Sequence, residues 1–234
     1  MSSQPDLDAQ KRAAAFKAAE YVHDGMVVGL GTGSTAKHLI LVLGEKVRGG
    51  LKIRGVPTSR DTADLAKRCG ISLLESDNAW TIDVAIDGAD QVDPQLNLVK
   101  GGGGALLKEK IVAAAAKRFI VMVDHTKLVP ALGGNFPLPI EVVPFGWGST
   151  AQQIEAACGG KAVLRERNGH VFQTEAGHVI LDLHLPKIDD PAALETTLNQ
   201  IPGIVETGLF VGRTSIVIVG TAQGVETRLA RGHE

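Results

Sequence analysis

The chain has 234 residues and a formal net charge of -2, and 44% of its residues are apolar and 21% charged. This composition is typical of a soluble globular protein with one large domain or two small ones. It argues against nucleic-acid and membrane partners, because the sequence contains no basic stripe, no basic amphipathic helix and no apolar run of membrane-spanning length. The start, MSSQPDLDAQ, lacks the basic and apolar regions of a signal peptide, so we expect a cytoplasmic protein.

The first half of the chain alternates strands and helices. Apolar residues at helical spacing, short apolar runs and glycine stops indicate these elements in turn. Their order predicts a parallel, doubly wound sheet. We expect helices over 7–21, 34–47, 59–70 and 105–117, and strands over 26–31, 51–58, 71–76, 81–90 and 118–124.

The sequence changes in character near LGGNFPLPIEVVPFGWGS, which is dense in Gly and Pro and indicates a domain boundary. Beyond it we expect strands over 140–143, 161–167, 178–185 and 203–210 and helices over 149–158 and 190–200, in the ferredoxin-like order βαββαβ. A further strand, 214–224, is of the buried type that can return to the first sheet. We therefore predict an α/β fold: a doubly wound, mostly parallel, Rossmann-like sheet in residues 1–132 and 210–234, with an inserted ferredoxin-like α+β domain in residues 133–209.

The cysteines and histidines do not indicate a metal site. Cys69 and Cys158 are far apart and form no CxxC pair, so we expect neither a disulfide nor a zinc site and interpret both as inert fillers. Asp182 and His184 would share one face of a strand. Without a third ligand at metal-binding spacing, we favour a solvated strand face.

The first candidate site is GLGTGSTA, Gly29 to Ala36, between a strand and a helix. A glycine-rich turn at a helix N-terminus presents N–H groups to an anion, and three hydroxyl residues lie beside it. The alternative is a tight turn in which Ser34 or Thr35 only caps the helix. The pattern also satisfies GxGxxA, but Thr58 and Ser59 stand where a dinucleotide site places its ribose carboxylate, so that interpretation ranks lower.

The second candidate is IDGAD, where a strand delivers Asp87 to its carboxyl end and Asp90 follows. Two carboxylates this close can serve as acid and base. An Asx turn with a loop cap is the simpler explanation for this motif alone.

The third candidate is KGGGGALLKEK, with Lys100, four glycines and Glu109 on a helix that is apolar almost all round. A carboxylate in apolar surroundings is a competent base near neutral pH. The alternative is that Lys108, Glu109 and Lys110 form a solvated patch at an exposed edge of the helix. A fourth stretch, VDHTKL, brings Asp124 and Lys127 to another strand end, where Lys127 suits a phosphate or carboxylate.

In this order and spacing GLGTGST, IDGAD, KGGGGALLKEK and DHTK resemble the ribose-5-phosphate isomerases of type A over nearly the whole chain. The resemblance implies an aldose–ketose isomerase that interconverts ribose 5-phosphate and ribulose 5-phosphate in the pentose phosphate pathway. It implies a small-molecule sugar phosphate as partner, no metal or organic cofactor, and a homodimer or larger homo-oligomer. The family usually has alanine where Gly104 stands, which leaves the rigidity of this loop in question.

The resemblance also implies the site residues. The catalytic base falls on Glu109, and we assign ring opening to Asp87, orientation of substrate hydroxyls to Asp90, and stabilisation of the oxyanion to Lys100 and the glycine backbone. The phosphate is held by GTGST, by Lys127, or by both. The implied substrate-binding positions are Thr32, Gly33, Ser34, Thr35, Asp87, Gly88, Ala89, Asp90, Lys100, Gly101, Gly102, Gly103 and Lys127. A sugar-phosphate sensor domain without turnover is the main alternative, and a nicotinamide-dependent dehydrogenase is the second.

Overall fold

The computed structural model describes residues 6–75 and 79–230, and the chain divides into two compact units. Residue 76, the last of the strand predicted over 71–76, lies outside the described residues. The first unit consists of Met1–Ala89, Lys108–Lys127 and Arg213–Glu234, and the second consists of Asp90–Leu107 and Leu128–Gly212. Each unit has its own sheet and is described by itself.

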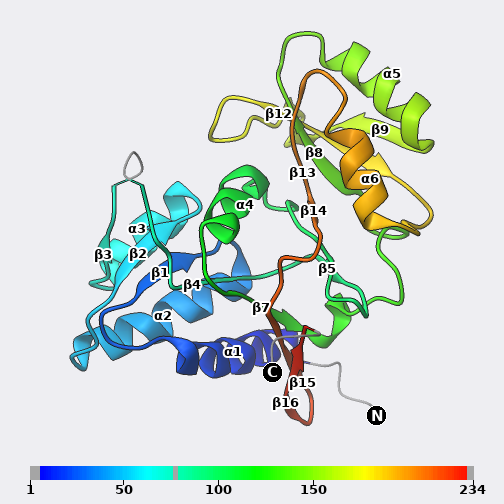
Figure 1. Ribbon diagram of the computed structural model, residues 1–234. Coiled ribbons are helices and arrows are strands. Elements are labelled where there is room, and N and C mark those ends of the chain that lie inside the picture. The colour runs from blue at the N-terminus through cyan, green and yellow to red at the C-terminus, as the bar shows by residue number, and fades with distance from the viewer. Residues whose placement is uncertain (1–5, 76–78, 231–234) are drawn as a thin grey trace. The chain divides into compact units, whose positions relative to one another are not determined.

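The first unit is built on a seven-stranded sheet, with strand order β16-β15-β7-β4-β1-β2-β3 (Figure 1). All neighbouring strands are parallel except the edge pair β15 and β16. This is the predicted doubly wound sheet, and the fold class is confirmed. The strands are β1 (Val27–Leu30), β2 (Arg54–Pro57), β3 (Ser72–Leu73), β4 (Val84–Asp87), β7 (Phe119–Asp124), β15 (Ile216–Thr221) and β16 (Gly224–Leu229).

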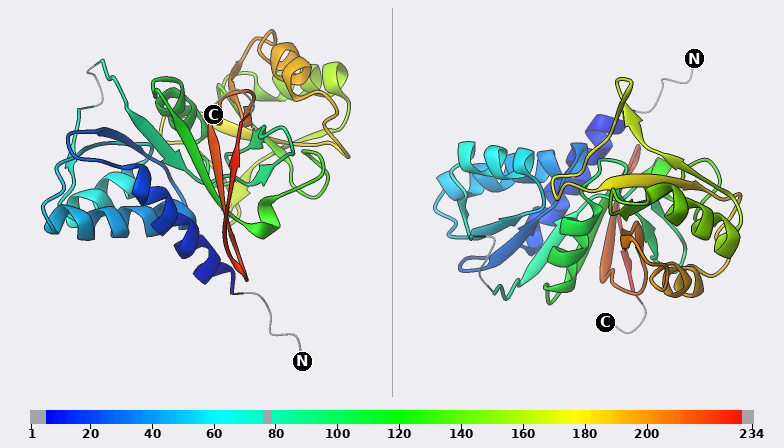
Figure 2. Two further views of the ribbon diagram at one scale, coloured as in Figure 1. Left: turned by 60° about the horizontal axis from the view of Figure 1, so that its bottom comes forward. Right: turned by 90° about the horizontal axis from the view of Figure 1, so that it is seen from above.

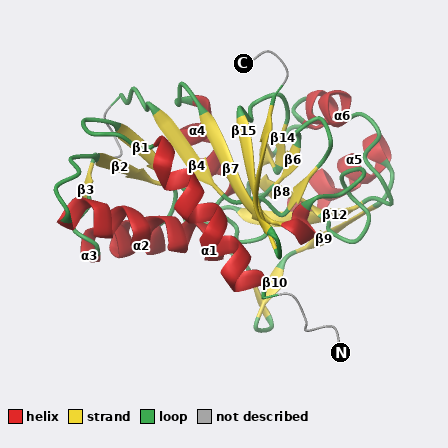
Figure 3. Cartoon of the chain, turned by 90° about the horizontal axis from the view of Figure 1, so that it is seen from below, coloured by secondary structure: helices red, strands yellow, loops and turns green. Residues whose placement is uncertain are grey.

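The helices of this unit cover both faces of the sheet, which is why its central strands are buried along their whole length. Three of them lie on one face (Figure 3), and Ile120 and Met122 of β7 pack into the core beneath them. Side-chain oxygens of Asp6 and Ser59 cap two of these helices. The helices are α1 (Leu7–Ala18), α2 (Ser34–Arg48) and α3 (Arg60–Arg68), with 3₁₀ turns at η1 (Ala19–Tyr21) and η2 (His125–Lys127).

Helix α4 (Leu106–Ala114) covers the opposite face of this sheet. It comes so close to β1 that a Cβ on Gly29 would lie 2.5 Å from Cγ1 of Val112 and 2.9 Å from Cβ of Ala85. Gly29 is therefore required by packing between helix and sheet, a role that is separate from ligand binding.

The last strands complete the sheet. As predicted, the run after residue 213 returns to it, and β15 pairs in parallel with β7. Helix α1 packs closely there, since a Cβ on Gly220 would lie 2.0 Å from the carbonyl oxygen of Gln10. The hairpin partner β16 was not predicted, because its residues are all exposed and carry no burial pattern.

The second unit contains a four-stranded antiparallel sheet of order β13-β8-β12-β9. The chain order strand, helix, strand, strand, helix, strand matches the predicted ferredoxin-like arrangement. Its two helices lie side by side (Figure 2), and Ile154 and Leu198 pack with the sheet in one core. The elements are β8 (Leu138–Val142), α5 (Trp147–Cys158), β9 (Lys161–Leu164), β12 (Val179–His184), α6 (Pro191–Leu198) and β13 (Ile204–Thr207).

Smaller strands in this unit were predicted only in part. A hairpin, β10 (Glu166–Arg167) and β11 (His170–Val171), turns at Asn168 and Gly169, both at positive φ; the pair Asn-Gly is a strong hairpin signal that the sequence analysis passed over. The strand predicted over 203–210 breaks at Gly208, whose carbonyl oxygen accepts the N–H of Lys100 at 2.9 Å. Beyond the break a three-stranded sheet joins β5 (Gln91–Val92), β6 (Leu98–Val99) and β14 (Leu209–Phe210). Strands β10 and β14 fall within the strands expected over 161–167 and 203–210, whereas β5, β6 and β11 were not expected.

The domain limits at residues 133 and 209 stay a prediction. The compact units differ from them mainly in residues 90–107, which group with the second unit. Among residues 6–75 and 79–230, no helix is both long enough and apolar enough to cross a bilayer.

Candidate functional site

In the first unit, polar residues gather where β1, β4 and β7 end. These strands are parallel neighbours, so their carboxyl ends share one edge of the sheet, where ligands bind in open α/β folds. The loop after β1 holds Gly31, Thr32 and Gly33, and β4 and β7 end at Asp87 and Asp124. The predicted residues of GLGTGST, IDGAD and DHTK that belong to this unit therefore start from one sheet edge.

Asp87 is buried, with 3% of its surface exposed, and its carboxylate is fixed by the backbone around it. Oδ1 accepts the N–H of Gly88 at 2.7 Å and that of Thr32 at 3.1 Å. A Cβ on Gly31 would lie 2.1 Å from the same oxygen. Gly31 is thus glycine because Asp87 occupies the space of its side chain, and this contact joins two motifs that lie far apart in the sequence.

The hydroxyl of Thr32 belongs to a cluster of hydroxyl groups. Its Oγ1 lies 2.7 Å from Oγ1 of Thr58 and donates to Oγ of Ser59 at 2.9 Å. Thr62, on the first turn of α3, donates to the carbonyl oxygen of Gly31 at 2.8 Å. From the sequence, Thr58 and Ser59 were notable only because they stand where a dinucleotide site has a carboxylate. The structure shows that they hold the glycine turn, and the β1–β2 pairing that brings them together leaves no local signal in the sequence.

The start of α2 presents backbone to the surface. Gly33 precedes the helix at φ 105°, makes no side-chain cap, and is exposed together with Ser34. The alternative in which Ser34 or Thr35 only caps the helix is therefore wrong, since Gly33 is the N-cap and both residues lie within the helix. Thr35 is buried, and a Cβ on Gly88 would lie 3.7 Å from Cβ of Thr35, which brings the two motifs close together.

Glu109 lies in the first turn of α4 with only 6% of its surface exposed. Lys110 is 4% exposed, so the solvated patch considered for residues 108–110 is not what the structure shows. The helix also buries Val112 and Ala113, whereas Ile111 is half exposed. The carboxylate of Glu109 therefore lies in a largely dehydrated setting, as the predicted proton acceptor requires.

The end of β7 is organised by local hydrogen bonds. Asp124 accepts the N–H of Thr126 at 3.0 Å and also the hydroxyl of Thr126. The next residue, His125, bonds through Nδ1 to Oε1 of the buried Gln10 at 2.6 Å. Asp124 thus shapes the turn that carries Lys127, which is half-buried in the short helix η2.

The remaining predicted residues lie in the second unit. Asp90 accepts the N–H of Gly102 through Oδ2 at 2.9 Å. Lys100, 3% exposed, places its ammonium 5.5 Å from the centre of the Phe210 ring. Asp90 therefore takes part in shaping the glycine loop, Gly101–Gly104, in addition to the role proposed for it on the substrate.

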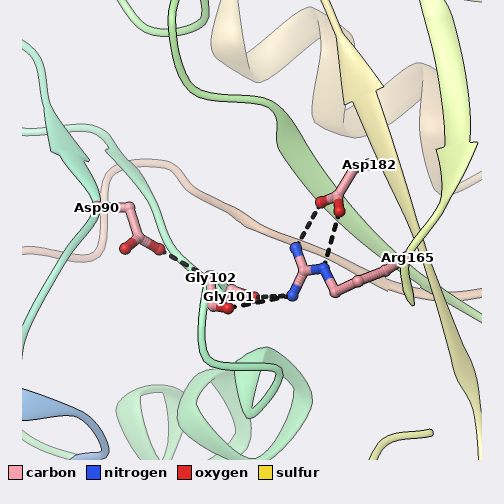
Figure 4. Close-up of polar contacts among 5 residues, drawn as sticks. All are labelled: Asp90, Gly101, Gly102, Arg165 and Asp182. Carbon is pink, nitrogen blue, oxygen red and sulfur yellow. Dashed lines mark hydrogen bonds and ion pairs between the residues drawn. The ribbon is translucent and has the colours of Figure 1, made fainter. Parts of the chain in front are cut away.

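An arginine that the sequence analysis did not single out also contacts the glycine loop (Figure 4). Nη1 of Arg165 donates to the carbonyl oxygens of Gly101 and Gly102 at 2.7 and 3.3 Å. Asp182 pairs with the same guanidinium through both carboxylate oxygens. The solvated strand face expected for Asp182 and His184 is therefore correct only for His184, which is exposed.

Gly104 has two structural reasons to be glycine. Its φ is +89°, which side chains rarely adopt, and a Cβ would lie 2.4 Å from the ring of Phe172. The loop thus turns sharply here beneath an aromatic ring. Glycine at position 104 does not leave this turn loose, because the turn is packed against the Phe172 ring.

Both cysteines are free thiols, Cys69 buried and Cys158 half-buried. In the part of the chain that the structure describes, His, Cys, Asp and Glu side chains form no group of three or more that could hold a metal ion.

Comparisons with known proteins agree with these motifs. Residues 54–224 match the family model of ribose 5-phosphate isomerase A (phosphoriboisomerase A). Relatives described as ribose-5-phosphate isomerase A include one from Bradyrhizobium diazoefficiens, 53% identical over 94% of this chain and 95% of its own, and one from Nitrobacter hamburgensis, 54% identical over 94% and 97%.

Solved structures are similar over the same length. A D-ribose-5-phosphate isomerase in complex with phospho-erythronic acid is 44% identical, covers 96% of this chain and 99% of its own, and has a TM-score of 0.92. The ribose 5-phosphate isomerase of Plasmodium falciparum is 34% identical, covers 96% and 100%, and has a TM-score of 0.93.

Proposed function

The chain belongs to the ribose 5-phosphate isomerase A family, and from that premise we propose that it interconverts D-ribose 5-phosphate and D-ribulose 5-phosphate through an enediolate, with Glu109 moving the proton. This is the aldose–ketose isomerisation of the non-oxidative pentose phosphate pathway. The observation that carries the proposal is the burial of Glu109, 6% exposed, on the helix that directly follows a loop of four glycines.

The chemistry requires one group to act as base and then as acid. Moving the carbonyl from C1 to C2 removes a proton from C2 and returns a proton to C1. A single carboxylate can perform both transfers, and burial favours a carboxylate that accepts a proton near neutral pH. Glu109 has that setting, whereas Asp87 is held by two backbone N–H groups that favour its charged form.

The remaining roles follow from charge and position. Negative charge develops on the oxygens of the enediolate, and Lys100 with the glycine N–H groups would stabilise it. Asp87 would assist opening of the furanose ring, and Asp90 would orient substrate hydroxyls. The proposed substrate contacts are Thr32, Gly33, Ser34, Thr35, Asp87, Gly88 and Ala89 and Lys127 in the first unit, and Asp90, Lys100, Gly101, Gly102 and Gly103 in the second.

The relative that binds phospho-erythronic acid supports this chemistry. Its ligand, phospho-erythronic acid, combines a phosphate with a carboxylate, and the carboxylate resembles an enediolate in being planar and in spreading negative charge over two oxygens. The exposed amides at the start of α2 suit a phosphate group, because the helix dipole and N–H groups favour an anion there.

Substitution of Glu109 by glutamine tests the base. We expect kcat to fall by at least about 100-fold, because the variant loses the proton acceptor but little volume, while substrate affinity changes little. Glu45→Gln, the same change on an exposed residue of α2, is the control and should leave both values unchanged. A Glu109→Gln variant with the kcat of the unsubstituted protein would refute the assignment.

A second measurement separates the isomerase from the alternatives. The protein is mixed with ribose 5-phosphate, without any added cofactor, and ketose is measured. Turnover supports the isomerase, binding without turnover supports a sensor domain, and a strict requirement for NAD supports a dehydrogenase. The hydroxyl cluster at Thr58 and Ser59, in place of a ribose carboxylate, argues against the last.

We also propose a cytoplasmic homodimer or larger homo-oligomer that acts without a metal. Light scattering checks the assembly, since a dimer would have twice the chain mass of 24.6 kDa. A mass equal to that of one chain would contradict it.

A further inference from the structure

The glycine loop, Gly101–Gly104, has no side chains of its own to hold its shape. Each glycine has more backbone freedom to lose than any other residue, so such a loop is ordered only by groups outside it. In the second unit the side chains of Asp90 and Arg165 form hydrogen bonds with it, and the side chains of Phe136, Pro139 and Phe172 lie against its glycines. Asp90 already has a proposed role on the substrate, whereas Arg165 has none.

We propose that Arg165, oriented by Asp182, is a positioning residue that fixes the peptide groups of the glycine loop so that their N–H groups meet the developing oxyanion. This inference rests on the proposed function and deepens it. Arg165 does not touch the substrate in this scheme; it acts through the loop.

The guanidinium is itself held firmly. Nε donates to Oδ2 of Asp182 at 2.8 Å, and Nη2 donates to Oδ1, so the two planar groups pair through two bonds. The side chains are only 11% and 17% exposed. The pairing leaves Nη1 directed at the loop, because the nitrogens of an arginine lie in a rigid fork.

The peptide between Gly101 and Gly102 is bound at both of its edges. Its carbonyl oxygen accepts from Arg165 at 2.7 Å, and its N–H donates to Asp90 at 2.9 Å. Since a trans peptide points its C=O and N–H in opposite directions, these two bonds fix the orientation of the plane. Figure 4 shows Arg165 and Asp90 on opposite sides of this segment.

The next peptide follows the same geometry. The carbonyl oxygen of Gly102 lies 3.3 Å from Nη1 of Arg165, so the N–H of Gly103 points away from the arginine. Gly103 is exposed, and a Cβ there would meet nothing within 4 Å. A cation at the carbonyl edge also polarises the peptide and strengthens its N–H as a donor. The arginine therefore both directs and strengthens the amide that we propose for the oxyanion.

The effect on kinetics should be asymmetric. A donor aimed at charge that develops in the transition state contributes mainly to kcat, whereas a group that only binds substrate contributes to KM. We expect Arg165→Gln to lower kcat about 10- to 100-fold, as for other losses of positioning, with KM changed less than about threefold.

Arg167→Gln is the matched control. This arginine lies two residues away, stacks 4.5 Å from the centre of the Phe172 ring, and is exposed on β10. The substitution removes the same charge from the same region, but among the described residues it is Arg165 whose guanidinium donates to the carbonyl oxygens of Gly101 and Gly102. Activity should stay at the level of the unsubstituted protein.

A second readout needs no turnover. In protein labelled with 15N-glycine, the hydrogen exchange of the Gly102 amide reports the order of the loop. We expect this exchange to become at least about tenfold faster in Arg165→Gln, because the loop then loses the hydrogen bonds that hold its carbonyl edge and opens more often. Asp182→Asn, which keeps the arginine but weakens its anchor, should shift exchange and kcat in the same direction and serves if Arg165→Gln does not fold.

The outcomes are distinct. A kcat loss with little change in KM, faster exchange at Gly102, and a normal Arg167→Gln support the inference. A folded Arg165→Gln with unchanged kcat and unchanged exchange overturns it, as does an equal loss in Arg167→Gln. If the unsubstituted protein does not turn over ribose 5-phosphate, the proposed function fails, and exchange at Gly102 still decides whether Arg165 holds the loop.

Discussion

At the scale of single residues, the glycines of GLGTGST serve different purposes. Gly29 admits Val112 of α4, Gly31 admits the carboxylate of Asp87, and Gly33 takes up a positive φ before α2. The sequence suggested one purpose for all three, a cradle for an anion. The structure assigns packing to the first and the placement of a proposed catalytic carboxylate to the second.

We expect Gly31→Ala to lower kcat by at least about tenfold, because its Cβ would displace Asp87 from a position 2.1 Å away. Enzyme kinetics with ribose 5-phosphate measure the loss. Gly148→Ala in α5 is the control, since a Cβ there meets nothing within 4 Å, and helix propensity should make it neutral or slightly stabilising. Normal activity in Gly31→Ala would show that the position of Asp87 is unimportant.

The two cysteines are expected to be dispensable. Burial raises the pKa of the Cys158 thiol, which leaves less of the reactive thiolate at neutral pH, and Cys69 packs in the core against Gly44. The double variant Cys69→Ser and Cys158→Ser should keep ordinary kcat and KM. Loss of activity with an unchanged circular dichroism spectrum would contradict the interpretation of both as fillers.

At the scale of elements, α4 shows how burial gives a charged residue its properties. The sequence predicted an apolar helix with a single carboxylate and left open whether that carboxylate was solvated. The structure shows that the carboxylate is buried. Helix α4 lies so close to β1 that the residues on the inner face of the helix are shielded from water.

The same helix is followed by Lys117, which ties it to the opposite end of the strands. Its ammonium donates to Asp83 at 2.8 Å, and the N–H of Val27 donates to the same carboxylate at 2.9 Å. The Lys117 hydrogen bond, with the backbone bond from Val27, holds the pKa of Asp83 below its ordinary value. A lowered pKa means that the charged form stabilises the folded state.

The pH dependence follows from that sign. The stabilisation is present above the unfolded pKa of Asp, about 3.9, and is lost as the pH falls through the lower folded value. We expect Asp83→Asn to reduce the free energy of unfolding at pH 7 by about 1 kcal/mol or less, since the pair is partly exposed. Urea denaturation at several pH values should show this difference shrinking below about pH 4. A difference that grows under acid would reverse the assignment.

At the scale of the whole molecule, the division into two units cuts through the motifs. IDGAD ends in the first unit at Ala89 and begins the second at Asp90, and KGGGGALLKEK is divided after Leu107. Each unit therefore carries part of both motifs. Asp87 and Glu109 belong to the unit with the parallel sheet, and the glycine loop belongs to the unit with the ferredoxin-like sheet.

The whole protein should work without a metal ion. A carboxylate can carry the proton, and N–H groups with a lysine can stabilise the enediolate, so the proposed mechanism assigns a protein group to each step that a metal would assist. Activity after dialysis against EDTA should equal that of untreated protein. A loss that is reversed by adding a divalent cation would refute this.

The sequence by itself determined the element order, the fold class and the family. Alternating apolar runs and helical patterns are local, and they predicted the parallel sheet and the βαββαβ order, because hydrophobic periodicity reflects which face each element buries. Strand β16 and the short strands β5 and β6 were not predicted, because β16 is exposed along its whole length and β5 and β6 have only two residues each.

Only the tertiary structure decided which groups touch. Asp87 against Gly31, Thr32 among the hydroxyls of the β2–α3 turn, and Arg165 on the carbonyls of Gly101 and Gly102 join residues that are far apart along the chain. Such contacts depend on strand pairing and register, which place distant residues within hydrogen-bond reach and leave no periodic trace in the residues themselves. Short-range sequence patterns therefore predict the helices and strands, whereas the relative positions of the chemical groups are set only when those helices and strands pack together.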